Sequence, residues 1–194
     1  MHRPPSPHAE DPICPKELIQ ARRRSHLAHR APRAGRPMMP ALYRMPSDAD
    51  GLLPWRHAVE CLERARNYWL ATTRPDGRPH ARPVFGVRLS GGMYFDGFCK
   101  TRWARNFAAQ PVVEVHLESG DEVVIVEGEL DGFTPEPALA AHITEDFAAK
   151  YVGYRVEAAD GVYRVCPHLT LAWSVEPVDG VRWKNATREL SSST

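Results

Sequence analysis

The sequence has few cysteines and no long hydrophobic run, and both absences narrow the class of protein. Its cysteines are widely spaced, at Cys14, Cys61, Cys99 and Cys166, and no C-x-x-C pair occurs. This spacing argues against a zinc knuckle and against a disulfide framework, and it is typical of reduced thiols in the cytoplasm. No apolar run approaches the ~18–20 residues of a membrane span, and the first residues lack an apolar signal-peptide core. We therefore expect a cytoplasmic protein with no membrane partner and no metal site.

The motifs of the common hydrolases and nucleotide triphosphatases are also missing. No G-x-S-x-G, P-loop or H-E-x-x-H occurs in the chain. Glu60 and Glu63 belong to one solvated helix face, so they are no paired-carboxylate site. We therefore predict no catalytic acid or base from these motifs.

The net charge of +1 hides an uneven distribution along the chain. Residues 1–44 carry nine Lys/Arg and three Asp/Glu, whereas residues 45–194 carry sixteen and twenty-one. The later part is therefore mildly acidic, which argues against a nucleic-acid partner. Residues 1–46 hold nine of the eighteen prolines and few bulky aliphatic side chains, so we predict a disordered, dispensable N-terminal extension. We expect translation to start near Met38, Met39 or Met45.

Residues 47–187 show the pattern of one domain built from short strands and a few helices. Apolar periodicity and turn residues predict strands over residues 68–73, 79–89, 93–95, 112–117, 122–130, 161–166, 170–175 and 181–185, and helices over residues 51–66, 101–109 and 135–150. Gly128 inside a strand pattern indicates a bulge or bend, as at the corner of a small barrel. The predicted fold is mainly β (α+β), an antiparallel barrel with flanking helices, followed by a flexible tail over residues 188–194.

The most informative segment is residues 68–107. Its first strand is apolar, aromatic and β-branched, and Pro-Asp-Gly at residues 75–77 forms a tight turn before the chain returns. Lys100, Thr101 and Arg102 then stand at a predicted helix start. A helix N-terminus offers unpaired N–H groups and a partial positive charge. The segment therefore predicts a phosphorylated cofactor bound beside a small barrel.

These features together resemble the pyridoxamine 5′-phosphate oxidase-like superfamily of FMN- or deazaflavin-binding split barrels. The resemblance rests on the order and spacing of YWLATT, PDGRPHARPV, MYF, TRWARNFAAQP, VVEVHLESGDEVVIVEG and VYRVCP…LAWSV, which together cover residues 54–185. It implies an antiparallel split β-barrel of the FMN-binding type. It also implies a homodimer with two cofactors at the subunit interface.

The resemblance further implies a set of cofactor-binding residues. Arg82 and residues 100–102 would surround the phosphate, residues 83–84 would line the flavin edge, and residues 94–96 would lie near the ribityl chain. Trp103 stands where the family often has lysine, in the order Thr–Arg–Lys–Ala–Arg–Asn, so it removes a cation and adds an aromatic plane. The implied set is Arg82, Pro83, Val84, Tyr94, Phe95, Asp96, Lys100, Thr101, Arg102 and Trp103.

The function implied by the resemblance is an oxidoreductase that moves a hydride between bound FMN and a small-molecule substrate. In such enzymes the ring system carries the difficult chemistry, which agrees with the missing acid–base pair. Two alternatives stay open, a reductase of the same fold that uses the deazaflavin coenzyme F-420, and a non-catalytic flavin- or haem-binding protein. The tail of F-420 needs an extended basic groove, to which Arg78 and Arg105 would contribute. The other subunit's late strands, near Trp173 and Trp183, would cover the ring.

Several of these side chains also have ordinary structural interpretations. His80 lies in an alternating strand, where a structural or cofactor-adjacent histidine is favoured over a general base. His116 is predicted to face away from the core. Trp69 and Trp173 are predicted to be core or dimer-interface aromatics, and Arg105 a surface residue.

Overall fold

The computed structural model describes residues 32–38, 40, 42, 49–89, 92–158, 162–175 and 179–184. In chain order its elements are β1 (Arg33–Gly35), α2 (Trp55–Arg64), β2 (Tyr68–Thr73), β3 (Pro79–Val84), β4 (Gly86–Leu89), β5 (Gly92–Phe95), α3 (Arg102–Ala109), β6 (Val112–His116), β7 (Val123–Phe133), α4 (Pro137–Lys150), β8 (Val162–Trp173) and β9 (Val181–Lys184). The predicted C-terminal tail and residues 1–31 of the predicted extension lie outside the described residues.

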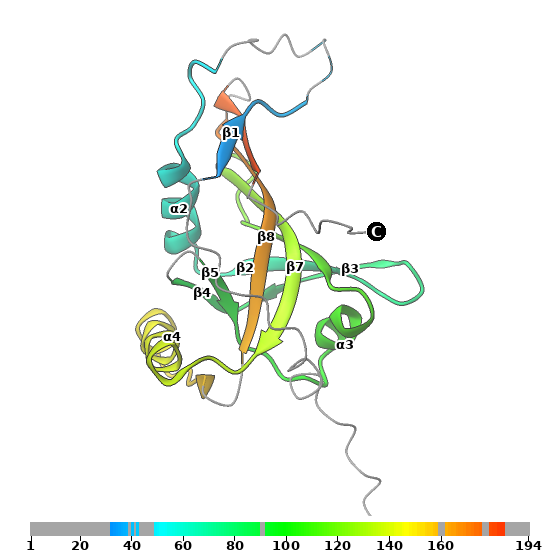
Figure 1. The fold of residues 1–194 in the computed structure, drawn as a ribbon, viewed down its shortest axis with the longest axis vertical. Helices are drawn as coiled ribbons and strands as arrows, with labels where there is room; N and C mark the ends of the chain where they lie inside the picture. The colour runs from blue at the N-terminus through cyan, green and yellow to red at the C-terminus, as the bar shows by residue number, and fades with distance from the viewer. Residues whose placement is uncertain are drawn as a thin grey trace, which may run out of the picture.

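The strands form one antiparallel sheet that curves around the core. Their order is β1-β9-β8-β7-β6-β2-β3, and β5 joins through β8 and carries β4. On the edge of β8 away from β7, residues 163–165 pair with β5, whereas residues 169–172 pair with β9. Figure 1 shows the long β7 and β8 through the middle, with α2 and α4 on one side and α3 on the other. The predicted mainly β, antiparallel architecture with flanking helices is confirmed.

The β2–β3 hairpin forms where the sequence predicts it. The Gly77 N–H donates to the Arg74 carbonyl at 2.9 Å, and the Arg74 N–H donates to the Arg78 carbonyl at 2.9 Å. Gly77 has a φ of 82°, a left-handed conformation that costs a residue with a Cβ more than glycine. The returning strand is interrupted at Phe85, so the single strand predicted over residues 79–89 is two strands, β3 and β4.

A β-bulge joins what the sequence predicts as two late strands. β7 and β8 pair along their length, and the register shifts between Glu127 and Gly128. Pro167, which has no N–H to donate, lies opposite Gly128 at this shift. A Cβ on Gly128 would collide with the backbone of Cys166. The bulge predicted at Gly128 is confirmed, whereas the predicted break at Pro167 is wrong because the bulge lets β8 continue through it.

Two clusters of buried apolar side chains hold the helices on the sheet. The larger cluster packs α2 and α3 against the strands and includes Leu70 and Trp183, and Trp55 meets the Trp183 ring edge-on at 5.1 Å. The smaller cluster packs α4 against β4 and the start of β8, through residues such as Ile143 and Phe147. Each of these four cluster residues is buried. α3 is therefore fixed against the face that carries the β2–β3 hairpin.

The N-terminal boundary differs from the prediction. Residues 33–35 form β1, which pairs with Arg182–Lys184 of β9. The prediction of a disordered segment through residue 46 is therefore wrong for these residues, because β9 supplies their hydrogen-bond partners. The limits of the predicted domain otherwise stay predictions. Among the described residues, no helix combines the length and the apolar character needed to cross a membrane.

Candidate functional site

The charges of three arginines act on one histidine where the β2–β3 hairpin meets the start of α3. His80 lies on β3, and the charges of Arg74, Arg102 and Arg82 all act on its imidazole. Arg82 is two residues further along β3, on the face that carries His80, and Arg102 is the first residue of α3. We call these four residues the arginine corner. Arg82 and Arg102 therefore lie near enough for both charges to act on His80, although they belong to different elements.

Buried hydrogen bonds fix α3 against the hairpin at this corner. Thr72 lies opposite His80 in the ladder, and its hydroxyl donates to the His80 carbonyl at 3.1 Å. The amide of Asn106, on α3, donates to the Thr72 hydroxyl oxygen at 2.9 Å. Thr101 caps the helix, since its hydroxyl oxygen accepts the Ala104 N–H at 3.4 Å. The first N–H groups of α3, which have no partner within the helix, are thereby held beside the hairpin.

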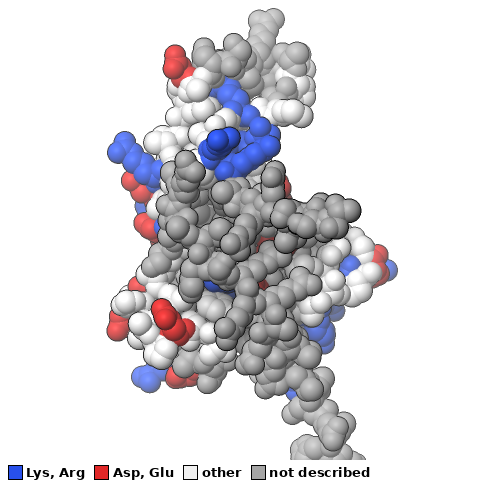
Figure 2. All heavy atoms as spheres, in the orientation of Figure 1, with Lys and Arg blue, Asp and Glu red and all other residues white. Residues whose placement is uncertain are grey.

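The corner carries positive charge that no carboxylate of the described residues offsets by an ion pair. Arg82 and Arg102 are exposed, and Arg74 Nε is buried with no hydrogen-bond partner among the described atoms. Leaving such a donor unpaired costs about 1–3 kcal/mol. At the tip of the hairpin, where basic and acidic spheres meet at the right of Figure 2, Arg78 instead pairs with Asp76 at 3.5 Å. The corner therefore fits an anion.

His80 is neutral at pH 7 because burial and the three arginine charges lower the pKa of its imidazole. Its Nδ1 lies 3.4 Å from the Thr72 hydroxyl oxygen. A neutral imidazole has one nitrogen that donates and one that accepts. Because the Thr72 hydroxyl hydrogen goes to the His80 carbonyl, the Thr72 oxygen accepts from Nδ1, which leaves Nε2 of neutral His80 as an acceptor. Binding an anion would offset the arginine charges that act on the imidazole and favour its protonated form, which donates from Nε2.

The strand residues of the implied set divide into exposed and buried ones. Pro83 is exposed on the edge strand β3, and Val84 is buried. Tyr94 and Phe95 are buried, with 5% and 1% of their surfaces exposed. The rings of Tyr94 and Phe95 therefore belong to the core, and only their backbone atoms could contact a ligand.

Two tryptophans expected at the cofactor also point into the core. Trp103 is 3% exposed, and its ring meets the Tyr163 ring edge-on at 4.7 Å. Trp183 is 1% exposed. Within the protomer neither ring offers a plane to a ligand, so these two expectations are corrected. Trp173 is half-buried at the end of β8, and Trp69 stacks on His116 with ring centroids 6.2 Å apart.

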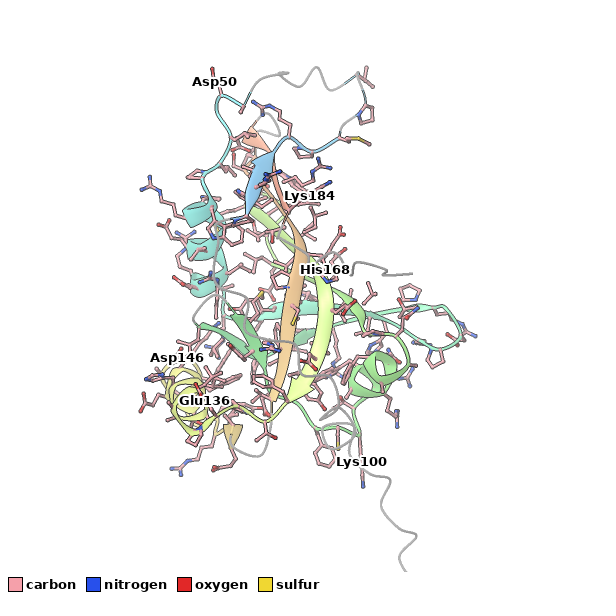
Figure 3. All side chains as sticks on the ribbon, in the orientation of Figure 1. Asp50, Lys100, Glu136, Asp146, His168 and Lys184 are labelled. Carbon is pink, nitrogen blue, oxygen red and sulfur yellow. The ribbon has the colours of Figure 1, made fainter. Side chains whose placement is uncertain are left out.

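Lys100 and Asp96 flank the loop before α3 without joining the arginine corner. Lys100 is exposed, and Figure 3 shows it extending away from the sheet below α3. Asp96 accepts a hydrogen bond from the Tyr154 hydroxyl at 2.6 Å, and burial raises the pKa of Tyr154. Neither side chain is placed beside His80, so of the implied set the structure brings Arg82, Thr101 and Arg102 to the corner.

Sequence reasoning missed three residues of this site, Thr72, Arg74 and Asn106. Asn106 had a usable signal, because it is three residues after Trp103 and therefore lies on the apolar face of its helix. A polar residue on such a face needs a buried partner. Thr72 and Arg74 had no local signal, since their roles depend on how α3 packs on the hairpin.

A second polar group lies at the end of α4. The Lys150 ammonium donates to the Tyr68 hydroxyl oxygen at 3.0 Å and to the Gly86 carbonyl at 2.9 Å. The Tyr151 hydroxyl donates to the Arg66 carbonyl at 2.6 Å and accepts the Gly86 N–H at 3.0 Å. Burial lowers the pKa of Lys150 to about 8. Because its partners are groups of the protein itself, this cluster has a structural role.

Comparison with solved structures identifies the fold. A conserved hypothetical protein from Mycobacterium tuberculosis is 20% identical over 75% of this chain and 98% of that chain, with a TM-score of 0.56. A NimC/NimA family protein from Clostridium acetobutylicum is 18% identical over 61% and 84%, with a TM-score of 0.50. The chain shares its fold with these two proteins.

A third solved structure overlaps less closely. It is a pyridoxamine 5′-phosphate oxidase-related, FMN-binding protein from Nostoc punctiforme, 20% identical over 70% of this chain and 91% of that chain, with a TM-score of 0.46. The fold assignment therefore rests on the other two structures. No family model matches the chain, and no curated protein does.

Proposed function

We propose that this split barrel is a cytoplasmic oxidoreductase that binds FMN and moves a hydride between it and a small-molecule substrate. The observation that carries the proposal is the arginine corner, where three cations without carboxylate partners meet a helix start. When bound, the flavin ring supplies the hydride chemistry. The protein supplies binding, orientation and the electrostatic environment.

The proposed roles at the corner follow from its geometry. Arg82 and Arg102 donate charge-assisted hydrogen bonds to the phosphate, which are about twice as strong as bonds between neutral groups. Arg74 Nε, buried and unpartnered, gains an acceptor. The N–H groups at the start of α3 and the Thr101 hydroxyl hydrogen complete the donors.

The extent of the positive charge favours FMN over coenzyme F-420. FMN ends at its phosphate, whereas the F-420 tail continues beyond it and needs further cations. The next arginine along the hairpin, Arg78, is already paired with Asp76. Of the two arginines that the sequence suggested for the F-420 tail, this leaves Arg105, which is exposed on α3. The corner is therefore matched to a single phosphate.

We also propose that the protein is a homodimer. β3 ends the strand order of the sheet, so one side of it has no strand partner among the described residues. Exposed apolar rings lie near the meander, with Phe98 66% and Phe85 37% exposed. Open sheet edges and apolar surface of this kind are usually covered by another chain. Light scattering of the purified protein should give twice the chain mass, and a monomer at micromolar concentration would contradict this proposal.

The absorbance spectrum of the purified protein tests the cofactor, and titration tests the site. We expect a yellow protein with the two visible bands of a flavin, and saturable binding when FMN is added to the apo form. A single deazaflavin band would indicate F-420 instead, and a sharp Soret band would indicate haem. A protein that binds neither FMN nor F-420 would refute the proposal. Anaerobic reduction of the bound flavin by a nicotinamide hydride donor separates an enzyme from a flavin-binding protein without activity.

A further inference from the structure

A nitrogen, a sulfur and an oxygen ligand atom converge between α2 and the start of β7, away from the arginine corner. His57 and Cys61 are one turn apart on one face of α2, and Glu122 directly precedes β7. The Cys61 Sγ lies 3.6 Å from His57 Nε2, which lies 3.8 Å from a Glu122 carboxylate oxygen. The ligand atoms of these three residues all lie within 4.8 Å of one another. We call them the His57–Cys61–Glu122 cluster.

These separations are close to the edges of a tetrahedral zinc site. With Zn–S at about 2.3 Å and Zn–N and Zn–O at about 2.0–2.2 Å, a tetrahedron places sulfur and nitrogen about 3.6 Å apart and nitrogen and oxygen about 3.4 Å apart. The 3.6 Å and 3.8 Å separations differ from these values by a few tenths of an ångström at most. The third separation, between Cys61 and Glu122, is within 4.8 Å, and the Glu122 side chain is half-exposed and therefore has room to move toward an ion.

We infer that the His57–Cys61–Glu122 cluster binds one Zn²⁺ ion. A thiolate, an imidazole and a carboxylate are the donors that zinc takes in proteins, whereas magnesium and calcium take oxygen donors alone. The thiolate and the carboxylate together balance the charge of the ion. Three protein ligands leave a fourth position for water or another ligand, as in zinc sites that stay open.

Arg64 lies beside the His57–Cys61–Glu122 cluster. Its Nη2 lies 3.1 Å from both carboxylate oxygens of Glu122 and 3.6 Å from Cys61 Sγ. The Arg64 side chain is 64% exposed, so it can swing into solvent when a metal arrives. Arg64 therefore competes with the ion for Glu122, and its removal should strengthen metal binding.

The thiol must lose its proton to bind zinc. Burial, with a smaller effect from Glu122, raises the pKa of Cys61 to about 11. The metal has to displace this proton, which lowers the apparent affinity relative to an exposed cysteine. The site is independent of the proposed flavin site, because α2 and α3 lie on opposite sides of the β7–β8 ladder in Figure 1.

Titration of the reduced, full-length protein with Co²⁺ tests this inference, because a cobalt–thiolate bond gives a charge-transfer band in the near ultraviolet. We expect the band to saturate at one cobalt per chain and to disappear when Zn²⁺ displaces the cobalt. In Cys61→Ser the band should be absent. His57→Ala and Glu122→Gln should weaken Co²⁺ and Zn²⁺ binding by at least the tenfold to hundredfold typical of losing an outer-shell partner. Arg64→Ala should bind both metals more tightly.

Glu60→Gln, an exposed carboxylate on the same helix, is the matched control and should bind as wild type. Circular dichroism in the presence of a chelator checks that each variant is folded, and a given Zn²⁺ concentration should raise the melting temperature of wild type more than that of Glu122→Gln. The inference is overturned if wild type gives no thiolate band, if the band persists in Cys61→Ser, or if folded His57→Ala and Glu122→Gln bind as wild type. None of these outcomes depends on FMN.

Discussion

Six arginines among the described residues form two groups that differ in their partners. Arg88, Arg164 and Arg64 each lie 2.9–3.1 Å from a carboxylate oxygen, from Glu63, Asp131 and Glu122 respectively. Arg74, Arg82 and Arg102 have no such partner among the described residues and instead gather around His80. A paired arginine is explained by the fold itself. Three unpaired arginines beside one neutral histidine are explained by an anionic ligand, and the difference can be tested residue by residue.

The largest effect is expected at the arginine corner. Arg82→Ala and Arg102→Ala should each weaken FMN binding tenfold to a hundredfold, because a charge-assisted hydrogen bond contributes about 1.5–3 kcal/mol. The melting temperature of the apo protein should change little, since both side chains are exposed. Fluorescence titration with FMN measures the affinity, and Arg105→Ala on α3 serves as the nearby control. Wild-type affinity in both variants would remove the basis for a phosphate site here.

Removing a paired arginine should lower the stability of the protein and leave FMN binding unchanged. We expect the largest loss of stability at Arg164. The Arg164 and Asp131 side chains are 18% and 22% exposed, and the guanidinium also lies 4.5 Å from the centre of the Phe133 ring. Arg164→Ala leaves Asp131 partly buried without its cation, so unfolding free energy should fall by about 1–3 kcal/mol. FMN affinity should stay unchanged. Urea denaturation measures the loss, and adding Asp131→Ala should recover part of it.

A smaller loss of stability is expected at Arg88. Its side chain is 13% exposed, but its partner Glu63 is 50% exposed, so water screens the pair. Arg88→Ala should lower the unfolding free energy by about 0.2–1 kcal/mol, the range measured for exposed pairs. The same urea denaturation detects it, with Glu60→Gln on α2 as a control. A loss as large as that of Arg164→Ala would show that burial does not separate the two pairs.

Lys150 is a further cation, and it donates to a hydroxyl and a carbonyl rather than to a carboxylate. Burial lowers its pKa to about 8, although nearby Asp146 acts in the opposite direction. The folded protein therefore loses this proton before the unfolded chain does, so the unfavourable burial of charge is fully present below pH 8 and is relieved as the pH rises toward about 10. Relative to Lys150→Met, wild type should gain stability between pH 8 and pH 9.5. Parallel curves for the two proteins would contradict the lowered pKa. The gain should stay below that of the full pKa shift, because the group is only partly buried and water screens it.

The sequence predicted those parts of the fold that depend on neighbours along the chain. The β2–β3 turn follows from Pro75 to Gly77, and α3 begins after Thr101, whose hydroxyl is the cap. β1 was missed because its hydrogen-bond partners are on β9, at the other end of the domain. The continuity of β8 was missed because Pro167 breaks a strand unless a bulge such as that at Gly128 receives it. Long-range pairing decided both cases.

The candidate site, like the fold, was predicted only in part from the sequence. Arg82, Thr101 and Arg102 came from the resemblance, and the structure gathers them, although their binding of phosphate stays a prediction. Trp103 was misjudged because helix position alone does not show which face is covered, and α3 buries that face against the sheet. The His57–Cys61–Glu122 cluster was beyond sequence reasoning, since its third ligand lies far along the chain from α2.

The pairing of β5 with β8 sets the order in which this protein can fold during synthesis. β5 ends at Phe95, and the strand that covers its free edge starts at Val162, so the ribosome must add residues 96–161 first. Until then Met93, Tyr94 and Phe95 have only β4 beside them. Contacts that join such distant residues form slowly, and strand edges that wait for them are prone to aggregate. A nascent chain stalled before Val162 is therefore expected to need chaperone protection that the full-length chain does not.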